Sequence, residues 1–248
     1  MMNDLEPALS LIRNRKPSRI AVLTGAGISA ESGIPTFRGA GGLWKEFRAE
    51  ELATPEAFDL DPALVWEWYE WRRDLIRNCE PNAAHVALAD LERSIGEDRF
   101  TLVTQNVDDL HRRAGNRRLL ELHGNIFRVR CTADGTVQEL AGAINDFPPR
   151  CRCGAPFRPD VVWFGEMLPP GVFEAAADAV SRADLLLIVG TSGTVYPAAG
   201  LAAYLEHGTS IELNIASTEL SSRCDVAIAG KAAEILPRLV EVIRSVAV

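Results

Sequence analysis

Short, almost continuous apolar runs alternate along the chain with longer stretches in which apolar residues recur every three or four positions. Near-continuous apolar strands that alternate with helices are typical of a parallel sheet covered on both faces. The pattern therefore predicts an α/β fold. The apolar runs predict strands at residues 19–24, 100–104, 119–122, 184–189, 210–214 and 225–229. The amphipathic stretches predict helices that begin near residue 4 and at 55–60, 62–78, 82–95, 171–182, 197–206 and 231–246.

Residues 131–160 interrupt this alternation. They show neither helical nor strand periodicity and hold three of the five cysteines. With 248 residues, the chain is long enough for one large domain, or for one domain with a small insert. We therefore predict a small inserted module at this position.

A glycine-rich turn follows the first predicted strand. Residues 25–30, Gly-Ala-Gly-Ile-Ser-Ala, fit the G-x-G-x-x-[G/A] fingerprint of dinucleotide-binding turns, although such turns are also common for purely structural reasons. A dehydrogenase would continue with a second strand that ends in an acidic ribose ligand. Residues 33–44 instead form a glycine-rich loop carrying Phe37, Arg38 and Trp44, which we interpret as a mobile lid. The pattern indicates a bound nucleotide that does not serve hydride transfer.

A polar cluster follows the predicted strand 100–104. Gln105, Asn106 and Asp108 stand where the carboxyl end of a parallel strand would hold a ligand, and His123 follows the next predicted strand. Amides, a carboxylate and an imidazole together suit a polyhydroxylated ligand, and the imidazole can move protons near neutral pH. The alternative for an isolated histidine is a satisfied core position at a strand-end turn.

Charge and cysteine content narrow the class of protein further. A net charge of −8 and a pI near 5.1 argue against a nucleic-acid-binding surface. The amino-terminal residues lack the basic and apolar regions of a secretory signal, and the longest apolar run is too short to span a bilayer. Five cysteines without an export signal fit a reducing compartment. We expect a cytoplasmic protein with neither membrane nor nucleic-acid partners.

Six motifs, taken together and in order, resemble the sirtuin family of NAD-dependent protein deacylases over about residues 18–232. The resemblance implies a single catalytic domain over 1–248 with a Rossmann-like large part (about 14–34, 80–128 and 166–248). It also implies a small part that is helical at about 35–79 and has a zinc-ribbon-like module at about 129–165. The motifs are Gly25-Ala26-Gly27-Ile28-Ser29, Thr36-Phe37-Arg38-Gly39, Gln105-Asn106-Val107-Asp108, His123-Gly124, Val161-Val162-Trp163-Phe164-Gly165-Glu166 and Gly190-Thr191-Ser192.

The resemblance also implies roles for individual residues. NAD would be consumed as a co-substrate: the acyl-lysine carbonyl oxygen attacks C1′ of the nicotinamide ribose, nicotinamide leaves, and an alkylimidate forms. His123 then acts as general base toward a ribose hydroxyl, giving free lysine and O-acyl-ADP-ribose, with Gln105, Asn106 and Asp108 as the other catalytic residues. The cofactor residues would be Gly25, Ala26, Gly27, Ile28, Ser29, Phe37, Arg38, Trp44, Gln105, Asn106, Val107, Asp108, Gly190, Thr191, Ser192, Asn214, Ile215, Ala216 and Ala232. The acyl-lysine peptide would add a strand along Val161, Trp163, Phe164 and Gly165.

Three residues between positions 53 and 72 indicate which acyl group the protein would prefer. Tyr69 and Arg72 share one face of the predicted helix and, with Ala53, match the pattern of sirtuins that prefer malonyl-, succinyl- or glutaryl-lysine. A guanidinium can bind the distal carboxylate through two hydrogen bonds, and a phenol can add a third. The alternative is an aromatic packing face with an arginine that reaches outward.

The cysteine module departs from the family pattern. Sirtuins hold structural zinc through two cysteine pairs, and Cys151 and Cys153 match the second pair. In the first pair, Cys131 is followed three residues later by Asp134 in place of a cysteine. Three thiolates and a carboxylate could still bind zinc, or the module could be held by packing alone, so both alternatives stay open here.

Three other functions compete with acid-acyl deacylation. The chain could act mainly on acetyl-lysine, or it could be a catalytically silent NAD or ADP-ribose sensor. Protein ADP-ribosylation is the third, because the same activated cofactor could meet another nucleophile. The match of His123, Gln105, Asn106 and Asp108 to the family motifs disfavours the silent sensor.

Overall fold

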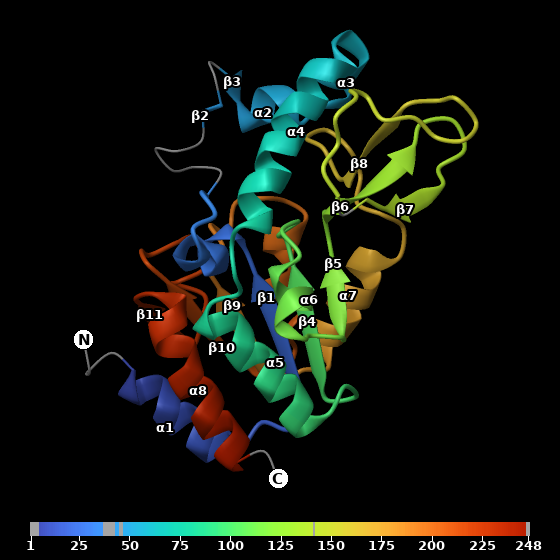
Figure 1. Ribbon diagram of the computed structural model, residues 1–248. Coiled ribbons are helices and arrows are strands. Elements are labelled where there is room, and N and C mark those ends of the chain that lie inside the picture. Colours follow the sequence, from blue (N-terminus) through green and yellow to red (C-terminus); the bar gives the residue numbers. More distant parts are fainter. Residues whose placement is uncertain (1–4, 37–42, 45–46, 141, 247–248) are drawn as a thin grey trace.

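A sheet of six parallel strands forms the centre of the molecule, in the order β11-β10-β9-β1-β4-β5 (Figure 1). The computed structural model describes residues 5–36, 43–44, 47–140 and 142–246. The predicted parallel α/β sheet is confirmed, and each predicted strand is found within about two residues of its expected ends. The strands are β1 (Ile20–Thr24), β4 (Phe100–Thr104), β5 (Leu119–Glu121), β9 (Leu185–Val189), β10 (Thr209–Asn214) and β11 (Val226–Ala229).

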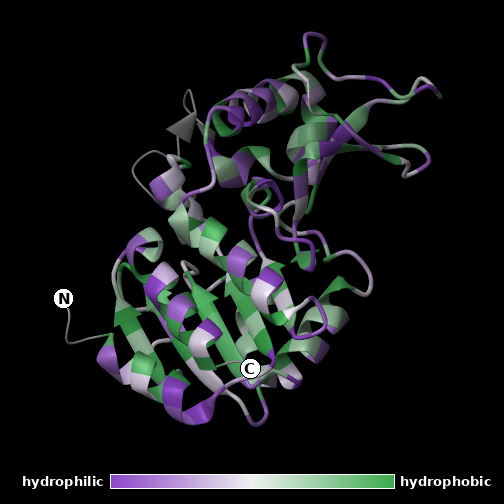
Figure 2. Ribbon diagram, turned by 60° about the horizontal axis from the view of Figure 1, so that its bottom comes forward, coloured by the Kyte–Doolittle hydropathy of each residue, from purple (hydrophilic) through white to green (hydrophobic). Residues whose placement is uncertain are grey.

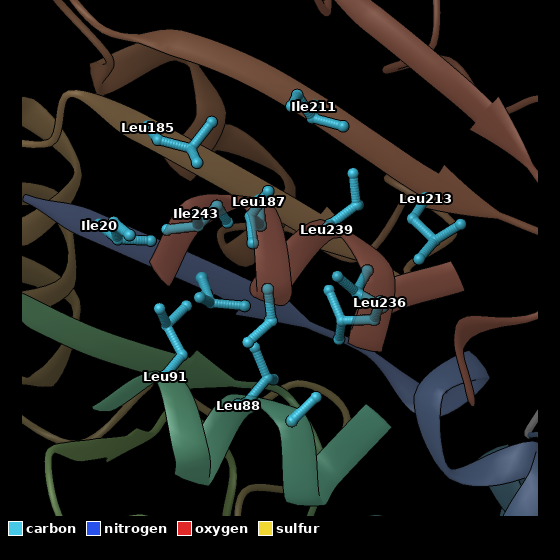
Figure 3. Packing of buried hydrophobic residues seen from close by; sticks show 14 of the residues in the cluster. Ile20, Leu88, Leu91, Leu185, Leu187, Ile211, Leu213, Leu236, Leu239 and Ile243 are labelled. Atoms are coloured by element: carbon cyan, nitrogen blue, oxygen red, sulfur yellow. The ribbon is translucent and has the colours of Figure 1, made fainter. Parts of the chain in front are cut away.

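Helices cover both faces of this sheet because alternate strand residues point to opposite sides. On one face, Ile20, Val22 and Leu187 belong to one hydrophobic cluster with residues of α1 (Glu6–Arg15), α5 (Ala83–Ile95) and α8 (Ala232–Val246). Figure 3 shows the side chains that α5 and α8 contribute to this cluster, such as Leu88 and Leu239. On the other face, the next residues along, such as Ala21 and Leu186, pack against α7 (Val172–Ser181) and the 3₁₀ helix η2 (Ala198–Tyr204). Figure 2 shows the strands as mainly hydrophobic between helices that carry polar residues.

A second hydrophobic cluster lies beyond one end of the sheet. Helix α4 (Pro62–Arg77) contributes most of its apolar side chains, including Trp66 and Trp68, and packs on a three-stranded antiparallel sheet in the order β7-β6-β8 (Figure 1). The strands of this sheet are β6 (Gly124–Cys131), β7 (Val137–Glu139) and β8 (Phe157–Val161). The remaining elements here are α2 (Ala49–Leu52), α3 (Pro55–Leu60) and the short pair β2 (Leu43–Trp44) and β3 (Phe47–Arg48).

Some local expectations were wrong. The stretch 131–160 was expected to lack strands, but it contains β7 and parts of β6 and β8; all three residues of β7 are exposed, so no alternation marked it. Helix α6 (Leu110–Ala114) is too short to give a periodic signal. The expected helices after the glycine turn and at 197–206 are instead 3₁₀ helices, η1 (Ala26–Ser32) and η2. Among the described residues, no helix is long and apolar enough to cross a membrane.

Candidate active site

A cavity of about 600 Å³ opens where the carboxyl ends of β1, β4, β9 and β10 face the second hydrophobic cluster. Ligands of doubly wound sheets bind at this end of the strands, where the chain switches direction across the sheet. Here the chain runs from β1 through β4 to β5 on one side and from β9 through β10 to β11 on the other. The predicted nucleotide turn, His123 and the predicted acyl residues therefore line one cavity.

The glycine turn lies against the end of β9. The Gly27 N–H donates to the Gly190 carbonyl at 2.8 Å, and a Cβ at Gly27 would lie 2.7 Å from the Gly190 Cα. No side chain fits between two backbones this close, because real Cβ contacts are longer than 3.0 Å. The turn and the β9 end thus form one backbone wall of the cavity.

A buried polar network supports Asn106 from behind. The Asn106 amide nitrogen donates to the Gly25 carbonyl at 3.2 Å and to Ser29 Oγ at 3.1 Å. Ser29 Oγ donates in turn to Asp108 Oδ2 at 2.7 Å, and the Leu110 N–H donates to Asp108 Oδ1 at 3.0 Å. Burial raises the pKa of the Asp108 carboxyl above its ordinary value, against the lowering effect of these two donors. Asn106 lines the cavity, and Ser29 and Asp108, which do not line it, hold Asn106 in place from behind.

Two further histidines, which sequence reasoning did not select, lie beneath this network. The Asn82 N–H donates to His85 Nδ1 at 3.3 Å, which leaves the proton on Nε2, 3.4 Å from Ser29 Oγ. The His111 ring lies 4.8 Å from the His85 ring, and burial lowers the pKa of both imidazoles. Both are neutral near pH 7. The sequence could have pointed to them only because each is a polar residue on the buried face of a helix.

His123 is the titratable imidazole of the cavity. Its Nδ1 lies 2.9 Å from the Gln105 carbonyl oxygen, which can only accept, so Nδ1 carries the proton and Nε2 is the basic nitrogen. Burial lowers the pKa of His123 below 6.5, and the hydrogen bond to Gln105 offsets part of this effect. Gln105 Nε2 donates to Thr191 Oγ1 at 3.0 Å, which ties the ends of β4 and β9 together. The ring is thus neutral and held in one tautomer near pH 7.

The predicted acyl residues line the same cavity, and two of them lie where α4 borders it. Tyr69 and Arg72 come from α4, and the Ala53 carbonyl accepts the Phe164 N–H at 2.9 Å. Burial raises the pKa of the Tyr69 phenol to about 12 and lowers the pKa of the Arg72 guanidinium. The guanidinium carbon of Arg72 lies 5.2 Å from the centre of the Trp68 ring, at cation–π distance. This part of the cavity therefore combines a neutral phenol with a shielded cation.

The cysteine module brings a fourth candidate metal ligand to the three cysteines. One ligand atom each from Cys131, Asp134, Cys151 and Cys153 lies within 4.8 Å of all the others, and the Sγ atoms of Cys131 and Cys153 are 3.6 Å apart. In a tetrahedral zinc site with Zn–S bonds of about 2.3 Å, two sulfur atoms lie about 3.8 Å apart. The arrangement therefore fits a zinc ion with three thiolate ligands and one carboxylate ligand.

Most sequence-predicted site residues line the cavity. Ile28 is an exception, since its side chain is fully buried in the sheet core, and Ser29 and Asp108 lie behind the wall. Phe37, Arg38 and the side chain of Trp44 lie outside the described residues. The predicted residues that line the cavity are Gly25, Ala26, Gly27, Ala53, Tyr69, Arg72, Gln105, Asn106, Val107, His123, Val161, Trp163, Phe164, Gly165, Gly190, Thr191, Ser192, Asn214, Ile215, Ala216 and Ala232. Lining residues to which the sequence analysis gave no role in the site include Trp68, Glu166, Leu168, Tyr196 and Thr218.

Comparisons with known proteins agree with this geometry. The Sir2 family model matches residues 25–197. The NAD-dependent protein deacylase 2 of Pyrobaculum aerophilum is 52% identical over 226 residues, which cover 90% of each chain. The NAD-dependent protein deacylase of Thermococcus kodakarensis is 52% identical over 240 residues, which cover 92% of this chain and 93% of that protein.

Solved structures extend the likeness to the whole fold. A Sir2 homologue in complex with NAD superposes with a TM-score of 0.89 at 46% identity, covering 98% of this chain and 95% of that one. A Sir2 protein bound to an acetylated peptide superposes with a TM-score of 0.81 at 28% identity, covering 97% and 98% of the two chains. The chain therefore belongs to the Sir2 family, the sirtuins, and is an NAD-dependent protein deacylase.

Proposed function

We propose that this NAD-dependent deacylase prefers lysines that carry succinyl, malonyl or glutaryl groups over acetyl-lysine. The observation that carries the proposal is the position of Tyr69 and Arg72, which line the same cavity as His123. An acetyl group has no distal carboxylate for a guanidinium to pair with, whereas an acid-type acyl group ends in one. The small, buried Ala53 beside them leaves room for a longer acyl chain.

The charges in this part of the cavity support the same preference. Arg72 remains a cation near neutral pH because a guanidinium does not lose its proton in proteins. Burial lowers its pKa, and the same desolvation strengthens its attraction to a carboxylate relative to water. Tyr69, with a pKa of about 12, remains a neutral hydrogen-bond donor. A carboxylate bound here would receive charge-assisted hydrogen bonds from both groups.

The catalytic roles rest on the same geometry. NAD supplies, when bound, an electrophilic ribose carbon that the acyl oxygen can attack. His123 Nε2 is the base that accepts the proton of a ribose hydroxyl, while Asn106 and Gln105 hold the ribose and carboxamide end. The turn at Gly25–Gly27 and the residues after β9 and β10 hold the remainder of the dinucleotide. The segment 161–165 pairs with the extended peptide and directs its acyl-lysine into the cavity. One water would be consumed, and the products would be nicotinamide, free lysine and O-acyl-ADP-ribose.

The test compares NAD-dependent turnover of succinyl-lysine and acetyl-lysine versions of one peptide by the wild-type protein. We expect kcat/KM for the succinyl peptide to be higher by at least about tenfold, which is the discrimination that one charge-assisted contact supplies. Equal or better turnover of the acetyl peptide would make the chain mainly a deacetylase. Absence of turnover on both peptides would favour a sensor or an ADP-ribosyltransferase.

We also propose that Cys131, Asp134, Cys151 and Cys153 hold a structural zinc ion, which lies outside the reaction. Purified protein is then expected to contain about one zinc per chain, and chelation is expected to lower Tm by about 5 °C or more. Because thiolate ligands must be deprotonated, zinc retention should weaken as the pH falls. Zinc content and Tm measured together at pH 6 and pH 8 check this.

Variants of Asp134 separate the carboxylate ligand from the fold. Asp134→Cys should retain zinc at higher chelator concentration than the wild type, and Asp134→Ala should lose it more readily. Asp146→Ala, an exposed carboxylate of the same module outside the cluster, is the matched control. Zinc retention that is identical in all four proteins would show that Asp134 is not a ligand.

A further inference from the structure

The indole of Trp163 bridges the proposed acyl pocket and a nearby ion pair. Trp163 follows β8 and is 3% exposed, and its Nε1–H donates to the Tyr69 hydroxyl at 2.8 Å. This bond joins residues 94 positions apart in the chain. The Tyr69 oxygen thus accepts a hydrogen bond from a group that can only donate.

The hydrogen bond from Trp163 limits the direction in which the Tyr69 hydroxyl can donate its proton. A phenol hydrogen lies in the ring plane in one of two positions, and an N–H directed at the oxygen occupies one of them. In the described part of the chain, Trp163 is the hydrogen-bond partner found for this hydroxyl. The phenol, which stays protonated because burial raises its pKa to about 12, is therefore set to donate to a ligand in the cavity.

An ion pair holds the indole in place. The Arg158 guanidinium lies 3.5 Å from the centre of the Trp163 ring and donates to the two carboxylate oxygens of Glu166 at 2.6 and 2.8 Å. Glu166 Oε2 also accepts the Trp163 backbone N–H at 2.8 Å. The Phe58 ring also packs on the indole, with the two ring centres 5.3 Å apart. Arg158 and Glu166 are only 18% and 26% exposed, so water and salt screen the pair weakly.

We propose that Trp163, oriented by the Arg158–Glu166 ion pair, is a positioning residue for acyl selectivity that acts through Tyr69 by directing its hydroxyl proton at the distal carboxylate of the acyl group. The inference rests on the proposed acid-acyl function and adds to it. An acetyl group offers no such acceptor, so the indole N–H matters for acid-type acyl groups and little for acetyl. Trp163 therefore contributes to acyl selectivity as well as to the lining of the cavity.

Four proteins test the inference with succinyl and acetyl versions of one peptide: wild type, Trp163→Phe, Tyr69→Phe and the double variant. Trp163→Phe keeps an aromatic ring but removes the N–H. We expect it to lower the ratio of succinyl to acetyl kcat/KM about tenfold, mainly through KM for the succinyl peptide. In the Tyr69→Phe background, the same substitution should change succinyl turnover by less than about twofold, because its effect is transmitted through the phenol.

One variant controls for the loss of a buried indole hydrogen bond, and two variants of Arg158 test the ion pair. Trp66→Phe removes another buried indole hydrogen bond, from α4 to the Phe157 carbonyl, without touching the cavity lining, and should leave the succinyl-to-acetyl ratio unchanged. Arg158→Met should lower the ratio about threefold, and Arg158→Lys, which keeps a cation over the ring, should recover part of it. These two variants test the same inference even if Trp163→Phe folds poorly.

The possible outcomes distinguish failure of the positioning role of Trp163 from failure of the acid-acyl function. Equal losses on both peptides, or an undiminished effect of Trp163→Phe in the Tyr69→Phe background, would overturn the positioning role alone. If the wild-type protein shows no succinyl preference, the acid-acyl function fails and this inference falls with it. A wild-type preference that Tyr69→Phe removes and Trp163→Phe leaves intact would keep the function and reject the role of the indole.

Discussion

Replacement of His123 by alanine is expected to lower deacylation by about a thousandfold while leaving NAD binding within a few-fold of the wild-type value. A positioned general base contributes a factor of this order, and alanine cannot accept the ribose proton. Binding of the dinucleotide should survive because the residues proposed to hold it are mainly the glycine turn and the residues after β9 and β10, which line the same cavity. Single-turnover rates with an acyl peptide and NAD titration by calorimetry measure the two effects separately.

The pH profile supplies a second test of the same role. His123 must be neutral to act as a base, and burial lowers its pKa below 6.5. The acid limb of kcat/KM should therefore lie below pH 6.5, with activity lost as the pH falls through that limb. His207→Ala, a change at an exposed histidine that does not line the cavity, should alter neither rate nor profile. Substantial turnover by His123→Ala would reject the assigned base.

Replacement of Arg72 by methionine is expected to lower kcat/KM for a succinyl peptide by about a hundredfold and to leave an acetyl peptide nearly unaffected. Removing one partner of a desolvated charge pair costs a few kcal/mol, and methionine preserves much of the side-chain volume. The loss should be largest in KM, because the carboxylate is bound in both the ground state and the transition state. Steady-state kinetics on the two peptides measure it.

Arg77→Met is the matched control for this prediction. Arg77 also lies on α4, but it pairs with Glu70 and Asp74 and does not line the cavity. Its replacement tests the cost of removing a guanidinium from this helix without touching the predicted acyl residues. An Arg72→Met variant that loses both activities in parallel would assign Arg72 to packing of the helix and would remove the basis for an acid-acyl preference.

The amino-acid sequence determined the α/β architecture because its signals are local. Strands buried on both faces must be apolar throughout, and helices that cover them must be apolar on one side, so both patterns are visible over short windows. The glycine turn, the polar cluster at residues 105–108 and His123 were also found in sequence, because each follows directly on a predicted strand. The family motifs then indicated their roles in NAD-dependent deacylation.

The tertiary structure decided which distant residues meet. Tyr69 and Trp163 form one hydrogen bond although 94 positions separate them. The position of Asp134 three residues after Cys131 left zinc binding open, and folding brings its carboxylate within 4.8 Å of all three cysteine sulfur atoms. Likewise, His85 and His111 became neighbours only when α5 and α6 packed on the sheet. Such contacts depend on chain topology and packing rather than on periodicity, which is also why the exposed strand β7 gave no signal. The sequence alone thus determined the fold and predicted most of the residues that line the cavity, while folding decided how the part of the cavity around Tyr69 and Arg72 is built.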